Sequence, residues 1–377
     1  MSDSRHAFPL GKAYGSAFCN REKETDQLLG HIKSGKHVLL IAPRRYGKSS
    51  LAERAIEKST YPAVKVNFHL STNEAEVAQL IMDSVSKLIG IAIGPVDKII
   101  NSIKRYLVNC EPSLTFGDDI ATLKLLPKKQ ENYAVMIVEA LLLIEKLLKE
   151  KKQKAVIFFD EFQEISLISK HNHIEGAIRT AAQEMQNLSI LFSGSIRSLL
   201  LSMFEDENRP LYKLCRKIKL ERIDALAYEK HIQKIAKATW KNSLDIAVFE
   251  KIMQLSNRHP YYVNYLCDTI WENNAQLPTL TEVEAAWHEV VMEEWGDAIK
   301  ELGDLSMGQR RLLKYLANNQ VRNIQSQAVA KKLSMATSSI ATATHALLEK
   351  DYLETDENRQ YQIVNPLLLA VLRGMEN

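Results

Sequence analysis

The sequence predicts an α/β fold in which a parallel sheet is covered by helices, within a chain of two or three domains. Two observations support this prediction. Short apolar runs alternate with segments of helical spacing over residues 1–220, and such alternation is typical of a parallel sheet whose strands are joined by helices. The chain has 377 residues, more than one hydrophobic core usually fills, which indicates two or three domains.

The composition is that of an ordinary globular protein, with 46% apolar and 25% charged residues, and the net charge of +3 does not indicate a nucleic-acid binder. No run reaches the roughly 18 uncharged apolar residues that a membrane span needs, and the amino terminus lacks the apolar core of a signal peptide. No C-x-x-C pair occurs, so neither a zinc site nor a disulfide framework is indicated. We therefore expect a cytoplasmic protein without a membrane partner.

The first predicted strand and helix enclose a turn with the pattern of a phosphate-binding loop. HVLLIA at 37–42 is a run of strand formers, and GKSSLAERAIEKS at 47–59 has helical spacing. The sequence APRRYGKS joins them and fits the pattern G-x-x-x-x-G-K-[ST], with Ala42 in place of the first glycine.

This loop offers the chemistry that a triphosphate needs. Successive N–H groups and the positive end of the following helix attract an anion, and Gly47 lets the backbone approach it closely. Lys48 would meet the β- and γ-phosphates, and the Ser49 hydroxyl would join the shell of a bound Mg²⁺. The nucleotide-binding residues predicted from the loop are Ala42, Pro43, Arg44, Arg45, Tyr46, Gly47, Lys48, Ser49 and Ser50.

A later strand supplies the carboxylate that the magnesium ion requires. In KAVIFFDEFQEI at 154–165, an apolar run leads to Asp160 and Glu161, and the carboxyl ends of parallel strands face the ligand crevice. Asp160 would hold Mg²⁺ through water, and Glu161 would orient or deprotonate an attacking water. A helix cap or a solvated acidic pair is the alternative. No Asn-Lys-x-Asp motif for guanine occurs, so the predicted cofactors are ATP or ADP with Mg²⁺.

Polar residues after another strand are candidates for sensing the γ-phosphate. Ser193 and Ser195 end the strand-like LSILFSGS at 188–195, although ordinary turn residues would look the same. Arg197 and Arg216 are candidates for a cation that stabilises the transition state. The alternative is that each lies at the surface or forms a structural ion pair.

The other elements of this region follow from the same periodicities. The predicted helices are 73–90, 95–108, 131–152 and 174–187, the predicted strands are 61–70 and KIKL at 217–220, and a hairpin at 112–127 turns at Gly117 and Asp118. We treat residues 72–130 as an insertion on the nucleotide domain.

Five stretches together resemble the archaeal-type ATPases of the STAND branch of P-loop proteins, which are relatives of AAA+ replication initiators. The resemblance implies that Asn20 and Arg21 pack near the adenine and that Pro260 approaches the base. Ala42 and Arg258 stand where that group usually has glycine. The five stretches are FCNREKE (18–24), APRRYGKSSL (42–51), FFDEFQEI (158–165), LFSGS (191–195) with RPLYKLCRKIKL (209–220), and SNRHPYYVNYLC (256–267).

The resemblance also implies three parts, a P-loop ATPase core at 1–220, a helical lid at 221–302 and a winged helix at 303–377. The residues support the last part independently, because three short helical patterns precede a predicted hairpin. The helices are expected at 305–317, 326–334 and 337–353, and the hairpin at 352–364, with residues 356–358 at its tip.

The predicted function is an ATP-binding and ATP-hydrolysing switch, in which the nucleotide state sets the arrangement of lid and winged helix and its contact with a protein partner or a second copy. One alternative is a DNA-engaged ATPase, such as a replication initiator or transposition helper. Its weakness is that 337–350 offers mostly Ser, Thr and Ala, although Arg310, Arg311, Lys331 and Lys332 could reach phosphates. The other alternative is a nucleotide-locked binding module with little turnover.

Overall fold

The computed structural model describes residues 7–94, 103–104, 107–117, 120–127, 132–355 and 360–374. The chain forms two compact units. The sheet unit comprises Arg21–Ala42 and Lys48–Leu220, and the helical unit comprises Met1–Asn20, Pro43–Gly47 and Glu221–Asn377. Within the described ranges, no helix has the length and hydropathy of a membrane span.

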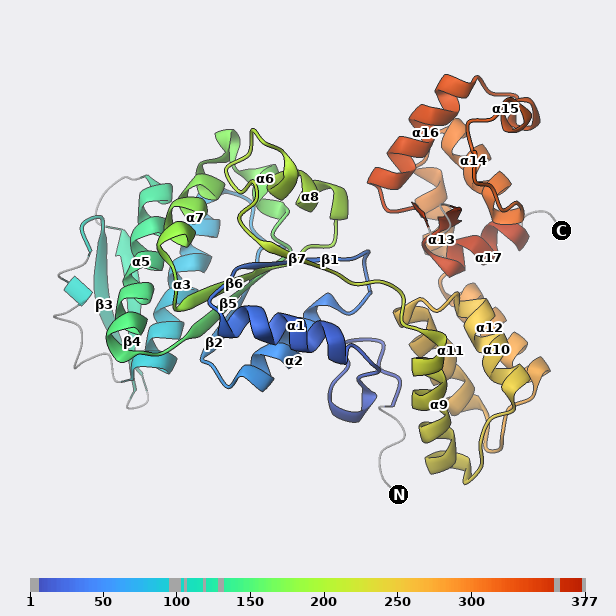
Figure 1. Ribbon diagram of the computed structural model, residues 1–377, viewed down its shortest axis with the longest axis horizontal. Helices are drawn as coiled ribbons and strands as arrows, with labels where there is room; N and C mark the ends of the chain where they lie inside the picture. Colours follow the sequence, from blue (N-terminus) through green and yellow to red (C-terminus); the bar gives the residue numbers. More distant parts are fainter. Residues whose placement is uncertain are drawn as a thin grey trace. The chain divides into compact units, whose positions relative to one another are not determined.

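Five parallel strands form the sheet of the first unit, in the order β2-β5-β6-β1-β7 (Figure 1). The three inner strands are buried along their whole length, as apolar runs must be when helices cover both faces. This confirms the predicted parallel sheet and brings all strand carboxyl ends to one edge. The strands are β1 (Val38–Ile41), β2 (Ala63–Asn67), β5 (Ala155–Asp160), β6 (Leu188–Phe192) and β7 (Arg216–Lys219).

Helices cover the two faces of this sheet (Figure 1). The helices α1 (Glu22–Lys33) and α2 (Lys48–Ser59) pack together on one face, and α3 (Glu74–Ile93), α5 (Tyr133–Lys151) and α7 (His173–Glu184) cover the other.

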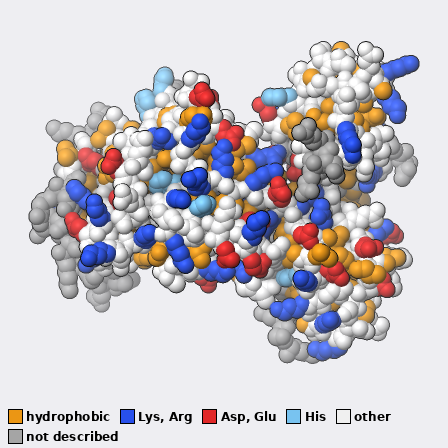
Figure 2. Space-filling model, viewed as in Figure 1, with side chains coloured by type: hydrophobic (Ala, Val, Ile, Leu, Met, Phe, Trp, Pro, Cys, Tyr) orange, Lys and Arg blue, Asp and Glu red, His pale blue; other side chains and the backbone are white. Residues whose placement is uncertain are grey.

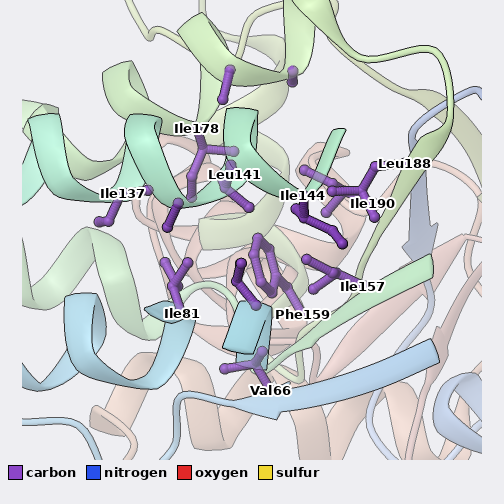
Figure 3. Close-up of a cluster of buried hydrophobic side chains, with 14 of the residues drawn as sticks. Val66, Ile81, Ile137, Leu141, Ile144, Ile157, Phe159, Ile178, Leu188 and Ile190 are labelled. Atoms are coloured by element: carbon purple, nitrogen blue, oxygen red, sulfur yellow. The ribbon is translucent and has the colours of Figure 1, made fainter. Parts of the chain in front are cut away.

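The core lies between the second set of helices and the strands. In Figure 3, Ile81, Leu141 and Ile178 from the three helices lie over Ile157 and Phe159 of β5. Each of these five side chains is fully buried, and burial of such a side chain stabilises the fold by about 1.5–3 kcal/mol.

Shorter elements complete the sheet unit. An antiparallel hairpin is formed by β3 (Cys110–Gly117) and β4 (Ile120–Pro127), as predicted, and α6 (Glu164–Ile168) and α8 (Arg197–Glu205) follow β5 and β6. Asp118, expected at the hairpin turn, and most of the helix expected at 95–108 lie outside the described residues.

The helical unit begins with five helices. Asp224, Asp245 and Thr279 cap three of them, because each side chain accepts a hydrogen bond from an N–H of the first turn. The helices are α9 (Ala225–Trp240), α10 (Ile246–Ser256), α11 (Pro260–Asn273), α12 (Leu280–Glu293) and α13 (Trp295–Gly303).

Three helices, a hairpin and a last helix form the rest of this unit and share one apolar core with the preceding helices. These elements confirm the helices and hairpin that the sequence predicts, and the expected hairpin tip, residues 356–358, lies outside the described residues. They are α14 (Met307–Asn318), α15 (Gln327–Leu333), α16 (Thr337–Glu349), β8 (Leu353–Thr355), β9 (Tyr361–Ile363) and α17 (Pro366–Gly374).

Candidate nucleotide-binding site

The end of the phosphate loop lies in the sheet unit, where α2 begins. Lys48 is buried, and its Nζ donates to the carbonyl oxygen of Ala42 at 2.9 Å, across the loop that separates them. Gly47 has a φ of 86°, in the left-handed region that favours glycine. Ser50 is also buried in the first turn of α2. The lysine is therefore held at the start of a helix, whose positive end attracts an anion.

Asp160, the last residue of β5, is the centre of a polar cluster in the sheet unit. One carboxylate oxygen, Oδ2, lies 3.1 Å from Ser49 Oγ and 2.5 Å from Lys65 Nζ. The other oxygen accepts a hydrogen bond from the hydroxyl of Ser193. Burial alone would raise the pKa of Asp160, but the hydrogen bond and charge of Lys65, together with the Ser193 and Ser49 hydroxyls, lower it below the ordinary value. Asp160 is therefore held as an anion.

Glu161 follows Asp160 in a left-handed conformation, with φ at 53°. Its Oε2 accepts hydrogen bonds from Ser195 N at 3.0 Å, from Ser195 Oγ at 2.7 Å and from Gln163 Nε2 at 2.8 Å. The carboxylate is therefore tied to the segment that follows β6. Non-glycine residues in this backbone region are uncommon, and they cluster where a side chain must be aimed.

A close approach supports this arrangement at Gly194. A Cβ atom at this position would lie 1.9 Å from Oε1 of Gln163, which is fully buried. Any larger residue would therefore displace Gln163 and, with it, one of the donors that hold Glu161.

A second group of predicted residues lies in the helical unit, where Arg45 and Tyr46 contact α11 and its neighbours. The guanidinium carbon of Arg45 lies 4.1 Å from the centre of the Tyr261 ring, and Arg45 Nη1 lies 3.6 Å from Glu294 Oε1. The Tyr46 ring meets the His259 ring edge to face, with centroids 4.8 Å apart. Two of the loop residues predicted to bind nucleotide, Arg45 and Tyr46, thus lie beside aromatic rings of the helical unit. Burial raises the pKa of Glu301, and the charges of Arg44 and Arg45 oppose this shift, so Arg44 acts on the same group of helices.

Most of the remaining predicted residues lie at the start of a helix. Arg21 is buried at the start of α1, where its guanidinium pairs with Glu24 at 2.8 Å, and Asn20 precedes it with φ at 56°. Pro260 is the first residue of α11. Arg197 begins α8. The roles predicted for these four residues, and for Pro43, stay predictions.

The cluster at Asp160 has the donors that a magnesium ion prefers. Mg²⁺ binds hard oxygen ligands and is usually held by one or two protein oxygens together with substrate phosphates and waters. The Ser49 hydroxyl and the Asp160 carboxylate provide two such oxygens 3.1 Å apart. The described residues contain no group of three or more His, Cys, Asp or Glu side chains that could hold a metal ion. The two oxygens of Ser49 and Asp160 fit a cation that takes its other ligands from phosphate groups and water.

Sequence reasoning missed three residues that the structure places at these clusters, Lys65, Gln163 and Glu294. Lys65 alternates with buried valines in β2 and so looks like an exposed residue of an edge strand. Gln163 follows the acidic pair in the motif FFDEFQEI and could have been noted from its position. Nothing in the sequence around Glu294 distinguishes it from the neighbouring glutamates.

The chain is similar to solved structures of two archaeal proteins. A Walker-type ATPase of Pyrococcus abyssi aligns with 97% of this chain and 99% of its own, with a TM-score of 0.69 and 18% sequence identity. The chain has the fold of the archaeal Walker-type ATPases. The ORC2 protein of Aeropyrum pernix, solved in ADPNP–ADP complexes, aligns with 98% of this chain and 97% of its own, with a TM-score of 0.59 and 13% identity. No protein-family model and no curated protein sequence matches the chain.

The Walker-type ATPase fold confirms the P-loop architecture that the sequence predicted. The similarity extends over nearly the whole length of both archaeal chains, so it includes the helical part after residue 220 as well as the sheet. At these identities it establishes the fold, and the chemistry of the site rests on the residues described above.

Proposed function

We propose that the chain is a molecular switch that binds ATP with Mg²⁺ and hydrolyses it. The observation that supports this proposal best is the 3.1 Å approach of Ser49 Oγ to Asp160 Oδ2, which joins the end of the phosphate loop to the end of β5. These two segments are 111 residues apart in the sequence. Their meeting at one edge of a parallel sheet is what a phosphate and metal site requires.

Each residue of the cluster has a role in this proposal. The loop N–H groups and Lys48 would bind the phosphates, and Ser49 and Asp160 would hold a magnesium ion, which would supply positive charge beside the phosphates. Glu161 orients the attacking water once it leaves Ser195, and the hydroxyl of Ser193 keeps Asp160 in place. Arg197 is a candidate cation for the transition state.

Coupling to the helical unit would use Arg45. This loop residue pairs with Glu294, and Glu294 also accepts hydrogen bonds from the hydroxyls of Tyr261 at 3.1 Å and Tyr262 at 3.3 Å. A phosphate that attracts Arg45 competes with Glu294, so nucleotide binding changes the contacts between α11 and the residue that follows α12. A ligand can shift a conformation only through such unequal contacts.

Calorimetry and turnover assays on two variants test the proposal. Lys48→Ala should weaken ATP binding at least about 100-fold, because a buried cation that meets the phosphates is lost. Glu161→Gln should bind ATP as the natural chain does and lose turnover. Lys58→Ala is a matched control, since Lys58 is an exposed lysine in the same helix. The absence of any heat from ATP or ADP with the natural chain would refute the proposal.

A DNA-engaged ATPase is the second candidate, and one surface favours it. Figure 2 shows basic and acidic side chains interspersed over the visible face. A hollow of about 330 Å³ between α14 and α15 is lined by three cations and no carboxylate. Its lining residues are Arg311, Lys314, Tyr315, Asn318, Asn319, Lys332 and Leu333.

Salt-dependent binding of duplex DNA distinguishes this candidate, because backbone contacts release counterions. Replacing Arg311, Lys314 and Lys332 by Gln should abolish that binding and any stimulation of ATP turnover by DNA, while leaving turnover without DNA unchanged. A natural chain that binds no duplex at low salt excludes the candidate.

A further inference from the structure

Lys65 is a cation built into the candidate metal site. It lies in β2, the edge strand that pairs with β5, in a register that places Lys65 opposite Phe158 and Asn67 opposite Asp160. Its Nζ lies 2.5 Å from Oδ2 of Asp160 and 5.0 Å from the centre of the Phe158 ring. The side chain is 31% exposed, so it reaches the carboxylate from the rim of the site.

The ammonium group of Lys65 contacts the same carboxylate oxygen as the Ser49 hydroxyl. Ser49 Oγ lies 3.1 Å from Asp160 Oδ2, and these are the two oxygens expected to hold Mg²⁺. A charge of +1 at this oxygen neutralises the carboxylate and repels a divalent cation from it. Free Mg²⁺ therefore gains little at Asp160 as long as Lys65 stays in this position.

Lys65 has a second acceptor within reach. Its Nζ lies 3.7 Å from Oε1 of Glu53, in the helix that follows the phosphate loop. A lysine side chain is a flexible stem that carries a compact charge, so the ammonium can move from Asp160 toward Glu53 without losing its ion pairing. The structure thus shows Lys65 at the Asp160 carboxylate, with a second carboxylate within reach of the same ammonium group.

We propose that Lys65 is a positioning residue that occupies the metal-binding side of Asp160 in the nucleotide-free protein and makes cation binding dependent on nucleotide. This inference rests on the proposed function. A complex of Mg²⁺ with ATP carries net negative charge and is attracted by Lys48 and Lys65, whereas the free ion is repelled. Asp160 would therefore take up the cation together with the triphosphate, and Lys65 would then pair with Glu53.

The test measures binding of Mn²⁺ to the nucleotide-free full chain by electron paramagnetic resonance. The natural chain should bind Mn²⁺ weakly, and Lys65→Met should bind it at least about tenfold more tightly, because a charge that opposes the ion is gone. Lys65→Arg, which keeps the charge, should behave as the natural chain does. The double variant Lys65→Met with Asp160→Asn should lose the gained affinity, which locates the new site at Asp160.

Thermal unfolding gives a second readout that does not depend on activity. Mg²⁺ without nucleotide should raise the Tm of Lys65→Met and leave that of the natural chain unchanged. Lys58→Met is the control for loss of a lysine in the neighbouring helix α2.

Equal Mn²⁺ affinity of the natural chain and Lys65→Met, in a sample that still binds ATP with Mg²⁺, would overturn the inference. A calorimetric titration of the same sample with ATP and Mg²⁺ separates this failure from failure of the proposed function, in which the natural chain would bind no adenine nucleotide at all.

Discussion

The guanidinium group of Arg45 is stacked on the ring of Tyr261, with its central carbon 4.1 Å from the ring centre. Arg45 itself has a left-handed backbone, with φ at 64°. Glu294 is the third member of this group, because it pairs with Arg45 and accepts a hydrogen bond from the Tyr261 hydroxyl. The arginine of a predicted phosphate loop is thus already bound to an aromatic ring and to a carboxylate, and the carboxylate would compete with a phosphate group for the guanidinium.

Replacing Glu294 by Gln should therefore increase ATP affinity. Arg45 loses an ion-pair partner at 3.6 Å and becomes available to phosphate, and pairs of this exposure contribute up to about 1 kcal/mol, or about fivefold in affinity. Calorimetric titration with ATP measures the change. Glu293→Gln is the matched control, since the neighbouring Glu293 accepts from Tyr265 instead. Unchanged or weaker affinity in Glu294→Gln would show that Arg45 is not held back by this pair.

Replacing Ser195 by Ala should raise the rate of ATP hydrolysis. The hydroxyl of Ser195 donates to Oε2 of Glu161 at 2.7 Å, and this bond holds the carboxylate that must orient water. Without this hydrogen bond to a charged group, the population of Glu161 side chains that are free of residue 195 and able to orient water should rise about tenfold.

Steady-state turnover at saturating ATP measures this effect, and the binding affinity should stay constant. Ser202→Ala in α8 is a control, since the Ser202 hydroxyl donates to a backbone carbonyl of its own helix. Turnover in Ser195→Ala that falls to the level of Glu161→Gln would contradict the prediction and assign Ser195 a direct part in the reaction.

The sequence predicted the elements that carry the site because each has a local signature. The apolar run of β5 ends at Asp160, and the loop pattern ends at Ser49, so the sequence predicts both residues of the candidate metal site. The structure adds that the two side chains are in contact. The strands and helices around them follow from the same periodicities. Residues 193–195, expected to continue a strand, instead turn away after Phe192, and Ser193 and Ser195 then bond Asp160 and Glu161.

The missed residues depend on distances that local patterns do not contain. Lys65 reaches Asp160 because β2 pairs with β5 in one particular register, although 95 residues separate the two side chains along the chain. An exposed position in an edge strand gives no indication of that pairing. Glu294 meets Arg45 for a similar reason, because helix packing decides which of several glutamates faces the loop residue.

The stability of the helical unit should fall in mild acid because of His259. Burial, with the nearby charges of Arg222 and Arg45, lowers the pKa of His259 to about 3, whereas an exposed histidine titrates near 6.5. The folded state keeps this histidine neutral while the unfolded state binds a proton, so stability is full above pH 6.5 and is lost as the pH falls toward 3. Between pH 7.5 and pH 5 this loss should be about 2 kcal/mol.

Urea unfolding at pH 7.5 and pH 5 measures the loss. In His259→Phe, the loss of stability between pH 7.5 and pH 5 should be about 2 kcal/mol smaller than in the natural chain. The phenylalanine ring can keep the contacts with Tyr46 and Tyr262 but does not titrate. The exposed His345, replaced by Gln, provides the control. Equal losses in all three chains would show that His259 does not set the acid sensitivity.

The stability of the sheet unit should depend strongly on Glu145, a buried carboxylate in α5. Its oxygens accept hydrogen bonds from the backbone N–H groups of Gln186, Asn187 and Leu188, at 2.9 to 3.1 Å, and so fix the turn before β6. Glu145→Leu would leave these buried donors without their acceptor, and each unsatisfied group costs about 1–3 kcal/mol. We expect a loss of about 3 kcal/mol or more in urea unfolding, against less than about 0.5 kcal/mol for Glu184→Leu at an exposed position of α7. If Glu145→Leu lost no more unfolding free energy than the control, water would have replaced the carboxylate. The turn before β6 would then not depend on Glu145.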